Sequence, residues 1–524
     1  MSFSSKCLLL FALTFLISLS VLSLKHKGLT FDEKHHFLYG LNILKGDSHR
    51  SSVFDNSVMP FSALNAFFTH QQDDLDSRVK NGRYVTIFFL ALLALIVFCW
   101  SKELYGTVPA LFSLFLFCLD PNIIAHGHLV TTDLYAAFSI TAALYFYWRF
   151  LKYGGYARAL ISAVALGISQ IAKYFSVFLY PLFLVMMVLW FLSDIMSSWK
   201  QKDFAALKNM ARSCIKYILI FLFINLLVIN IGFCFLRPFV PLQNYFFQSH
   251  TFQLIQKVPV LHSIPLPVPY PFVQGMDLCK YAEQTGQSFG PNYLLGVLHR
   301  NGTGFKGYFL IAMFFKLPLA ALFIILISLL VYFHRYHHYV FVHKEMFLLL
   351  PALFYLIFFN LFININIGIR YILFIFPLFY IFCGSLFVFW DQYPVWIKRS
   401  YLLLMVSIAL SVLSFYPYYL GYFNEFIGDR KLAYKILADS NLDWGGDEWF
   451  LHNYLEKHPK AILTPSRPVA GRIIVSVNDL TGVSGNWKRF RWLRDNFKPD
   501  DQIASSFLVY DITKEDLRRI HVSK

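Results

Sequence analysis

The sequence predicts an all-α integral membrane protein of about eleven transmembrane helices, followed by a small C-terminal α/β domain. Of its 524 residues, 57% are hydrophobic and only 15% are charged, and the mean hydropathy is +0.53. Soluble domains carry roughly 25% charged residues. Many apolar runs also approach the ~20 residues that cross a bilayer core. The low content of charged residues therefore indicates that much of the surface faces lipid.

Eleven apolar segments are the predicted spans. The long apolar stretch 159–193 is divided in two, because as one helix it would measure about 52 Å, against a hydrocarbon core of ~30 Å. A turn at Lys173 also removes a charge from its middle, where lipid contact would be costly. The first run lacks a small-residue cleavage site, which indicates an uncleaved span. The spans are 7–24, 84–100, 107–125, 134–151, 158–172, 176–193, 215–236, 308–333, 345–363, 371–390 and 399–418.

The distribution of basic residues predicts the orientation of these spans. Lys and Arg outnumber Asp and Glu by 46 to 30, and cytoplasmic loops collect such residues. With the N-terminus inside, the short outer loops hold only Lys173 and Arg370 as bases. The segment 197–213 is predicted as a basic amphipathic helix on the inner leaflet. The basic excess thus fits a membrane, and no basic-aromatic module indicates a nucleic-acid partner.

This orientation divides the chain into two parts. Residues 1–418 are the predicted membrane domain, with outer loops 25–83 and 237–307, and residues 419–524 are the predicted extracytoplasmic segment. That segment contains the strand-like runs "RIIVSV" and "SSFLVYDI" and the helix-like "TKEDLRRI". The seven cysteines lie mostly in or beside apolar runs, so no disulfide framework is predicted.

Two carboxylate motifs fall on the predicted outer side. The first, "TFDEKHHFLYG", holds Asp32, Glu33 and His36, and its carboxylates could act as a general base or bind a cation. An interfacial polar cluster is the alternative. The second, "LVTTD", places Asp133 at the mouth of the fourth span, where it could also be a helix cap.

Three cations on the same side predict an anion site. They are Lys173, Lys316 and Arg370, the last followed by Tyr371. Arginine suits phosphate because its planar group donates two parallel hydrogen bonds. Interfacial snorkelling explains any one of these bases, but explains three together less well.

The densest polar segment is "DSNLDWGGD", residues 439–447. Asn441, Asp443 and Trp444 suit a sugar, because an aromatic ring packs on C–H faces while carboxylates accept hydroxyl groups. The spacing does not match an EF-hand calcium loop. A capped, turn-rich loop is the alternative.

Taken in order, these motifs resemble the C-type membrane glycosyltransferases of the protein-mannosyltransferase-like class. The series is Asp-Glu after span one, "LVTTD", "KLPL", "GIRY" and "GYFNE" followed by "DSNLDWG", and it covers residues 1–450. Its closest branch is the bacterial family-39-type, phospholipid-carrier-dependent enzymes. The resemblance implies a C-type glycosyltransferase fold and a polyprenyl-phosphate-linked sugar donor. It also implies a bacterial inner-membrane protein with a periplasmic active site.

The resemblance assigns the base of the first outer loop to Asp32 or Glu33 and the acid of the second to Asp133. The chemistry of the residues agrees with this assignment. A base must deprotonate an acceptor hydroxyl, and cations must hold the departing phosphate. We therefore hypothesise an inverting single displacement onto a lipid, glycan or protein acceptor, with Asp32 as base and Glu33 as its partner. No cofactor is required, and a divalent cation on Asp32, His36 and Asp133 stays open.

Two other classes share the predicted topology. A transporter or channel would carry polar residues midway along its spans, whereas the notable charges here gather at one membrane face. A lipid-linked glycan polymerase or ligase has the same arrangement and stays an alternative.

Overall fold

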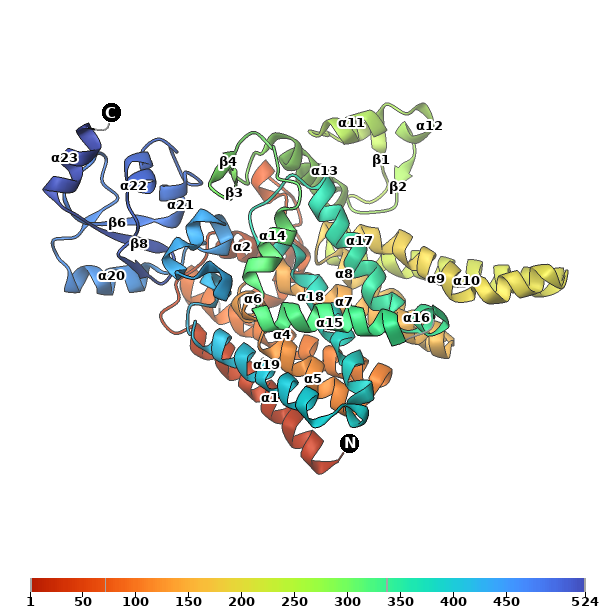
Figure 1. The fold of residues 1–524 in the computed structure, drawn as a ribbon. Coiled ribbons are helices and arrows are strands. Elements are labelled where there is room, and N and C mark those ends of the chain that lie inside the picture. Colours follow the sequence, from red (N-terminus) through yellow and green to blue (C-terminus); the bar gives the residue numbers. More distant parts are fainter. Residues whose placement is uncertain (1, 71, 336–337, 523–524) are drawn as a thin grey trace.

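Helices make up most of the structure, and each of the eleven predicted spans overlaps at least one of them (Figure 1). The computed structural model describes residues 2–70, 72–335 and 338–522. The bundle consists of α1 (Phe3–Ser23), α4 (Leu75–Tyr105), α5 (Thr107–Cys118), α6 (Pro121–His126), α7 (Thr132–Tyr153), α8 (Tyr156–Gln170), α9 (Leu179–Lys200), α10 (Phe204–Gly232), α14 (Tyr308–Lys316), α15 (Leu319–Arg335), α16 (His338–His343), α17 (Met346–Phe362), α18 (Phe376–Cys383) and α19 (Val395–Leu413).

Six helical segments in the described part of the chain are long and apolar enough to cross a membrane, or seven if the bent pair α14–α15 is one span. The chain is therefore a mostly helical, polytopic integral membrane protein. The six are Phe3–Ser23, Leu75–Tyr105, Tyr174–Lys200, Phe204–Gly232, Ile369–Val388 and Val395–Leu413. Four more predicted spans coincide with helices that are shorter or less apolar, namely α5–α6, α7, α8 and α17.

The break at Lys173 is confirmed, because α8 ends at Gln170 and a 3-10 helix begins at Tyr174. The span predicted at 308–333 is not one continuous helix. Helices α14 and α15 meet at 116°, where Pro318 lacks the N–H that a continuous helix needs. The separate amphipathic helix at 197–213 is wrong. Its residues form the end of α9, a tight turn and the start of α10, so its bases sit at the tip of a helical hairpin.

Shorter elements connect the bundle helices. Between α1 and α4 lie α2 (Glu33–Leu44) and α3 (Ala63–Phe67). The segment between α10 and α14 carries β1 (Val240–Pro241), α11 (His250–Gln256), α12 (Pro259–His262), β2 (Pro265–Leu266), α13 (Tyr270–Thr285), β3 (Asn292–Leu294) and β4 (Val297–His299).

The C-terminal segment folds around a four-stranded mixed sheet in the order β5-β6-β8-β7. The two predicted strands and the predicted helix are confirmed as β6, β8 and α23. Strand side chains alternate between faces, so Ile474 and Val509 pack toward α20 while Ile473 and Tyr510 join the main core of the bundle. The elements are α20 (Glu448–Lys457), β5 (Ile462–Leu463), β6 (Gly471–Ser476), α21 (Val477–Thr481), α22 (Arg491–Asn496), β7 (Asp501–Ile503), β8 (Phe507–Ile512) and α23 (Lys514–Val522).

Candidate active site

A cavity of about 530 Å³ brings together most of the motifs singled out in the sequence. Its walls come from stretches far apart in the chain, including the first connecting loop, the turn after α8, the segment after α17 and the C-terminal domain. Five predicted site residues and one metal candidate line it: Asp32, Lys173, Arg370, Tyr371, Trp444 and His36.

Arg370 joins two carboxylates at the cavity wall. Its Nη1 lies 3.2 Å from Asp32 Oδ2 and 3.4 Å from Asp133 Oδ2. Its Nε donates to Ser440 Oγ at 3.2 Å, and its guanidinium lies 4.0 Å from the centre of the Trp444 ring. These contacts fix the orientation of the one cation that touches both predicted acids.

The backbone before Arg370 explains this placement. A Cβ at Gly368 would lie 2.3 Å from Ser440 Oγ, so a side chain there would displace the hydroxyl that contacts Arg370. The amide of Ile369 donates to Asn441 Oδ1 at 3.0 Å. Asn441, predicted to bind substrate, is fully buried and does not line the cavity. It holds the turn that presents Arg370.

Asp133 and Lys173 form a second ion pair next to Arg370. Asp133 is fully buried in the first turn of α7, where the helix dipole favours a negative charge. The Lys173 ammonium also lies 5.1 Å from the centre of the Tyr371 ring. Asp32, Arg370, Asp133 and Lys173 thus alternate in sign, and an incoming anion must compete with carboxylates for both cations.

Lys316 does not reach this row. Its Nζ donates to the backbone oxygens of Leu420 at 2.7 Å and Asn441 at 2.8 Å, and the side chain is buried. The predicted anion site therefore holds two of its three cations. Lys316 instead ties the end of α14 to the segments around Leu420 and Asn441.

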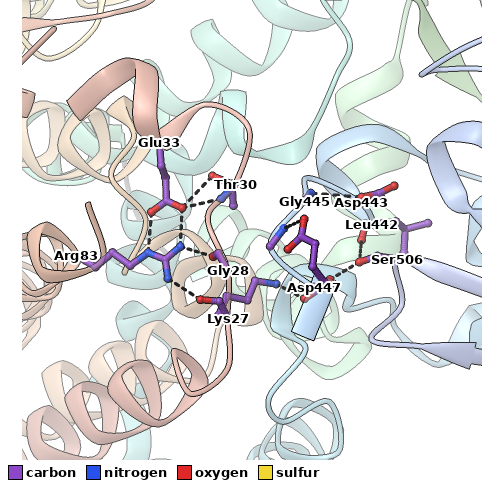
Figure 2. A network of polar contacts seen from close by, with 12 residues as sticks. Lys27, Gly28, Thr30, Glu33, Arg83, Leu442, Asp443, Gly445, Asp447 and Ser506 are labelled. Carbon is purple, nitrogen blue, oxygen red and sulfur yellow. Dashed lines mark hydrogen bonds and ion pairs between the residues drawn. The ribbon is translucent and has the colours of Figure 1, made fainter. Parts of the chain in front are cut away.

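Glu33 points away from the cavity and pairs with Arg83 (Figure 2). Arg83 Nε donates to Glu33 Oε1 at 2.8 Å and Nη2 to Oε2 at 2.6 Å. The amides of Thr30 and Val130 donate to the same carboxylate. Burial opposes ionisation, but Arg83 and these amides outweigh it and hold the pKa of Glu33 below its ordinary value. Glu33 is thus a positioning residue that anchors the loop carrying Asp32.

Arg83→Met should lower the free energy of unfolding by about 3–5 kcal/mol, because it leaves a buried, uncompensated carboxylate. Thermal unfolding in detergent measures the loss. Lys34→Met is the matched control, since Lys34 pairs with Asp76 at 2.7 Å and both side chains are about half exposed; it should leave the midpoint unchanged. An Arg83→Met protein as stable as the control would contradict this role of the pair.

The segment 439–447 connects the cavity to the C-terminal domain. Asp443 lies outside the cavity lining; its backbone oxygen accepts from Asn478 Nδ2 at 2.8 Å, and burial raises the pKa of its carboxyl to about 6. Asp447 pairs with Lys27 at 2.9 Å and accepts from Ser506 Oγ (Figure 2). Of the predicted residues in this segment, only Trp444 faces the cavity.

Asp439 and Asn478 also line the cavity, although neither was among the predicted substrate-binding residues. Asn478 Oδ1 accepts from the Asp439 amide at 2.9 Å, and Asp439 has a left-handed φ of 57°. Burial raises the pKa of Asp439 to about 7. Asp439 opens the motif "DSNLDWG", so its position was visible in the sequence. Asn478 follows an ordinary strand and left no such signal.

The candidate metal ligands Asp32, His36 and Asp133 do not form a ligand group. No cluster of three or more His, Cys, Asp or Glu side chains arranged for a metal occurs within residues 2–70, 72–335 and 338–522. Asp133 faces Lys173 and Arg370 instead. Burial lowers the pKa of His36 to about 4, so its ring is neutral at pH 7, the form that can ligate a metal. The set fits a cation poorly because Asp133 already pairs with two protein cations.

Fold and site together define an integral membrane protein with a row of alternating carboxylates and cations at the wall of a polar cavity. Residues 68–246, about a third of the chain, match the family model described as dolichyl-phosphate-mannose-protein mannosyltransferase. The resemblance to the protein-mannosyltransferase-like class is thereby confirmed, and the matched residues include Asp133 and Lys173.

The search of curated proteins gave no match. The solved structures that match include ArnT from Cupriavidus metallidurans bound to undecaprenyl phosphate. That chain is 14% identical to this one, with a TM-score of 0.47, and the alignment covers 78% of this chain. This chain spans 64% of the length of ArnT.

Proposed function

We propose that the chain is a membrane glycosyltransferase that moves a sugar from a polyprenyl-phosphate donor to an acceptor hydroxyl on the extracytoplasmic side. The observation that carries the proposal is the contact of Arg370 with both Asp32 and Asp133 at the wall of the cavity. It places a phosphate-binding group beside a carboxylate that can act as a base. The family match over residues 68–246 supports the same class.

A second, mostly apolar cavity of about 380 Å³ supports a lipid-linked donor. It shares Lys173, Tyr371 and Phe289 with the polar cavity. Its remaining wall includes Phe178 and Phe358, from the regions of α9 and α17. A donor phosphate at Lys173 and Arg370 would therefore have an apolar channel for the first isoprene units of its chain.

The proposed reaction is a single displacement. The acceptor oxygen attacks the anomeric carbon, the bond from that carbon to the phosphate oxygen breaks, and its electron pair stays on the phosphate. Asp32 takes the hydroxyl proton. Arg370 and Lys173 stabilise the growing phosphate charge. Because the phosphate competes with Asp32 for Arg370, donor binding weakens their ion pair and leaves the carboxylate to face the acceptor hydroxyl. The products are an inverted glycoside and the polyprenyl phosphate.

The proposal includes the topology predicted from the loops, namely eleven spans, a cytoplasmic N-terminus and a periplasmic active site in a bacterial inner membrane. The C-terminal domain, residues 419–524, and the cavity then lie on one side. The charged side chains of the site then gather at one membrane face. This favours an enzyme over a transporter, whose charges would lie along a path through the bundle. A lipid-linked glycan polymerase or ligase is the runner-up, and it would differ in using a glycan acceptor.

Turnover of a donor by purified protein tests the proposed function. The protein, reconstituted in nanodiscs, is given a panel of undecaprenyl-phosphate hexoses and pentoses with a membrane extract as acceptor. We expect loss of one donor with release of undecaprenyl phosphate. Intact donors throughout the panel, together with uptake of a labelled solute by proteoliposomes, would overturn the enzyme in favour of a transporter.

Asp439 should make donor binding sensitive to pH. Its pKa of about 7 means that the carboxyl is mostly neutral at pH 6 and mostly ionised at pH 8. The donor is a phosphodiester with constant charge over this range, so the ionised carboxylate repels it. The donor KM should rise about fivefold from pH 6 to pH 8 in the wild type and stay level in Asp439→Asn. Glu456→Gln, at an exposed position, should keep the wild-type rise of KM with pH. The same rise in Asp439→Asn would refute the role of Asp439 in this pH dependence.

A further inference from the structure

The segment between α10 and α13 forms a small unit outside the candidate spans. Strand β1 pairs with β2 in an antiparallel ribbon, and α11 and α12 lie between them in the sequence. In Figure 1 this unit lies at the edge of the molecule, on the opposite side from the C-terminal sheet. Leu242, Tyr245 and Phe247 of the unit lie in one buried cluster with Ile229 of α10 and Phe272 of α13.

Other apolar side chains of this unit are exposed. Val260 is 77% exposed, Phe239 64%, Leu254 50%, Ile264 42%, Val258 41% and Leu261 40%. We call these six side chains the apolar patch. In α10, a candidate span, Leu219 and Phe223 are exposed to the same degree, 61% and 67%. A patch of this kind marks an interaction surface when it lies outside a core.

The charged residues near the patch indicate which kind of partner it binds. Residues 204–276 contain no Asp or Glu. Arg237 lies two residues before Phe239, and Lys257 lies between Leu254 and Val258; both are exposed. Basic side chains beside exposed apolar ones are the composition of elements that lie in a membrane interface, where the cations meet lipid phosphates.

The position of the unit agrees with a lipid partner. Helix α10, a candidate span, ends at Gly232, only seven residues before Phe239, so the patch begins close to the end of that span. Thr251, Phe252 and Met276 line the apolar cavity that opens toward Lys173. The unit therefore lies between the end of a candidate span and the channel proposed for the donor lipid.

We propose that the unit formed by β1, α11, α12 and β2 docks into the outer leaflet of the bilayer through the apolar patch. The patch sits among the headgroups and upper acyl chains, with Arg237 and Lys257 at the phosphate level. This docking is independent of the sugar chemistry, and it places the membrane surface against the rim of the channel.

Depth-dependent fluorescence quenching tests the docking. Val260→Cys, in a variant whose native cysteines are Ser, is labelled with bimane and reconstituted in vesicles of phosphatidylethanolamine and phosphatidylglycerol. A nitroxide high on the acyl chain should lower its emission at least about twofold, while aqueous iodide quenches little. Glu456→Cys, at an exposed position of α20, should respond to iodide and not to the nitroxide.

Ile264→Cys provides a second position should the first variant fail to fold, as judged by gel filtration. Quenching of both patch positions by iodide to the level of Glu456→Cys would overturn the proposal. Protection from both quenchers, with cross-linking to a dimer, would overturn it in favour of a second copy of the chain. None of these readouts depends on glycosyl transfer, so they stand apart from the test of the proposed function.

Discussion

Asp32→Asn should lower kcat by a factor of about 10²–10⁴, the range typical for loss of a general base. The side chain lines the cavity and is partly exposed, so the substitution disturbs little packing. It also removes the carboxylate that competes with a phosphate for Arg370. The affinity for polyprenyl phosphate should therefore stay equal or increase while turnover falls. Initial rates and equilibrium binding on the same preparation separate the two effects.

Asp76→Asn is the matched control for Asp32→Asn, because Asp76 is an exposed carboxylate in the first turn of α4 that pairs with Lys34 outside the cavity. It should leave kcat within about twofold of the wild type. An Asp32→Asn enzyme with near wild-type kcat would remove Asp32 as the base. Asp439 would then be the next candidate, since it lines the same cavity.

Local composition was sufficient to predict most of the helices. These signals depend only on neighbours in the sequence. Long apolar runs predicted the helices, the charge at Lys173 predicted the break after α8, and the alternation in "RIIVSV" predicted strand β6. The differences arose where tertiary context decides. Pro318 marks a break locally, but the angle of 116° depends on what α14 and α15 pack against, and the hairpin at 201–203 depends on how far α9 and α10 extend.

The site was predictable only as a set of candidates. Asp32, Asp133, Lys173 and Arg370 meet because four loops converge. Glu33 lies next to Asp32 in the sequence, yet the first turn of α2 directs it to Arg83, which no local pattern marked. Lys316 is charged like Lys173, but its Nζ is taken by backbone oxygens. Adjacency and charge identify residue types suited to the chemistry, whereas the packing of loops decides which of them reach the cavity.

Arg370→Lys should lower kcat/KM for the donor by about 10²–10³, the usual cost of removing one donor to a developing charge. Lysine keeps the positive charge but not the planar fork, so it cannot contact Asp32, Asp133 and a phosphate together. Arg430→Lys is the matched control, because Arg430 stacks on Phe415 outside the cavity; it should change kcat/KM little. An Arg370→Lys enzyme within threefold of that control would show that phosphate binds elsewhere.

The double variant Asp32→Asn/Arg370→Lys tests whether the base and the cation act as one unit. If Arg370 binds the phosphate and so weakens the ion pair to Asp32, the arginine contributes to turnover partly through that carboxylate. Effects of residues that act together are not additive. The double variant should then lose little more activity than Asp32→Asn alone. Losses that multiply would mean that the 3.2 Å contact between the two side chains has no part in the reaction.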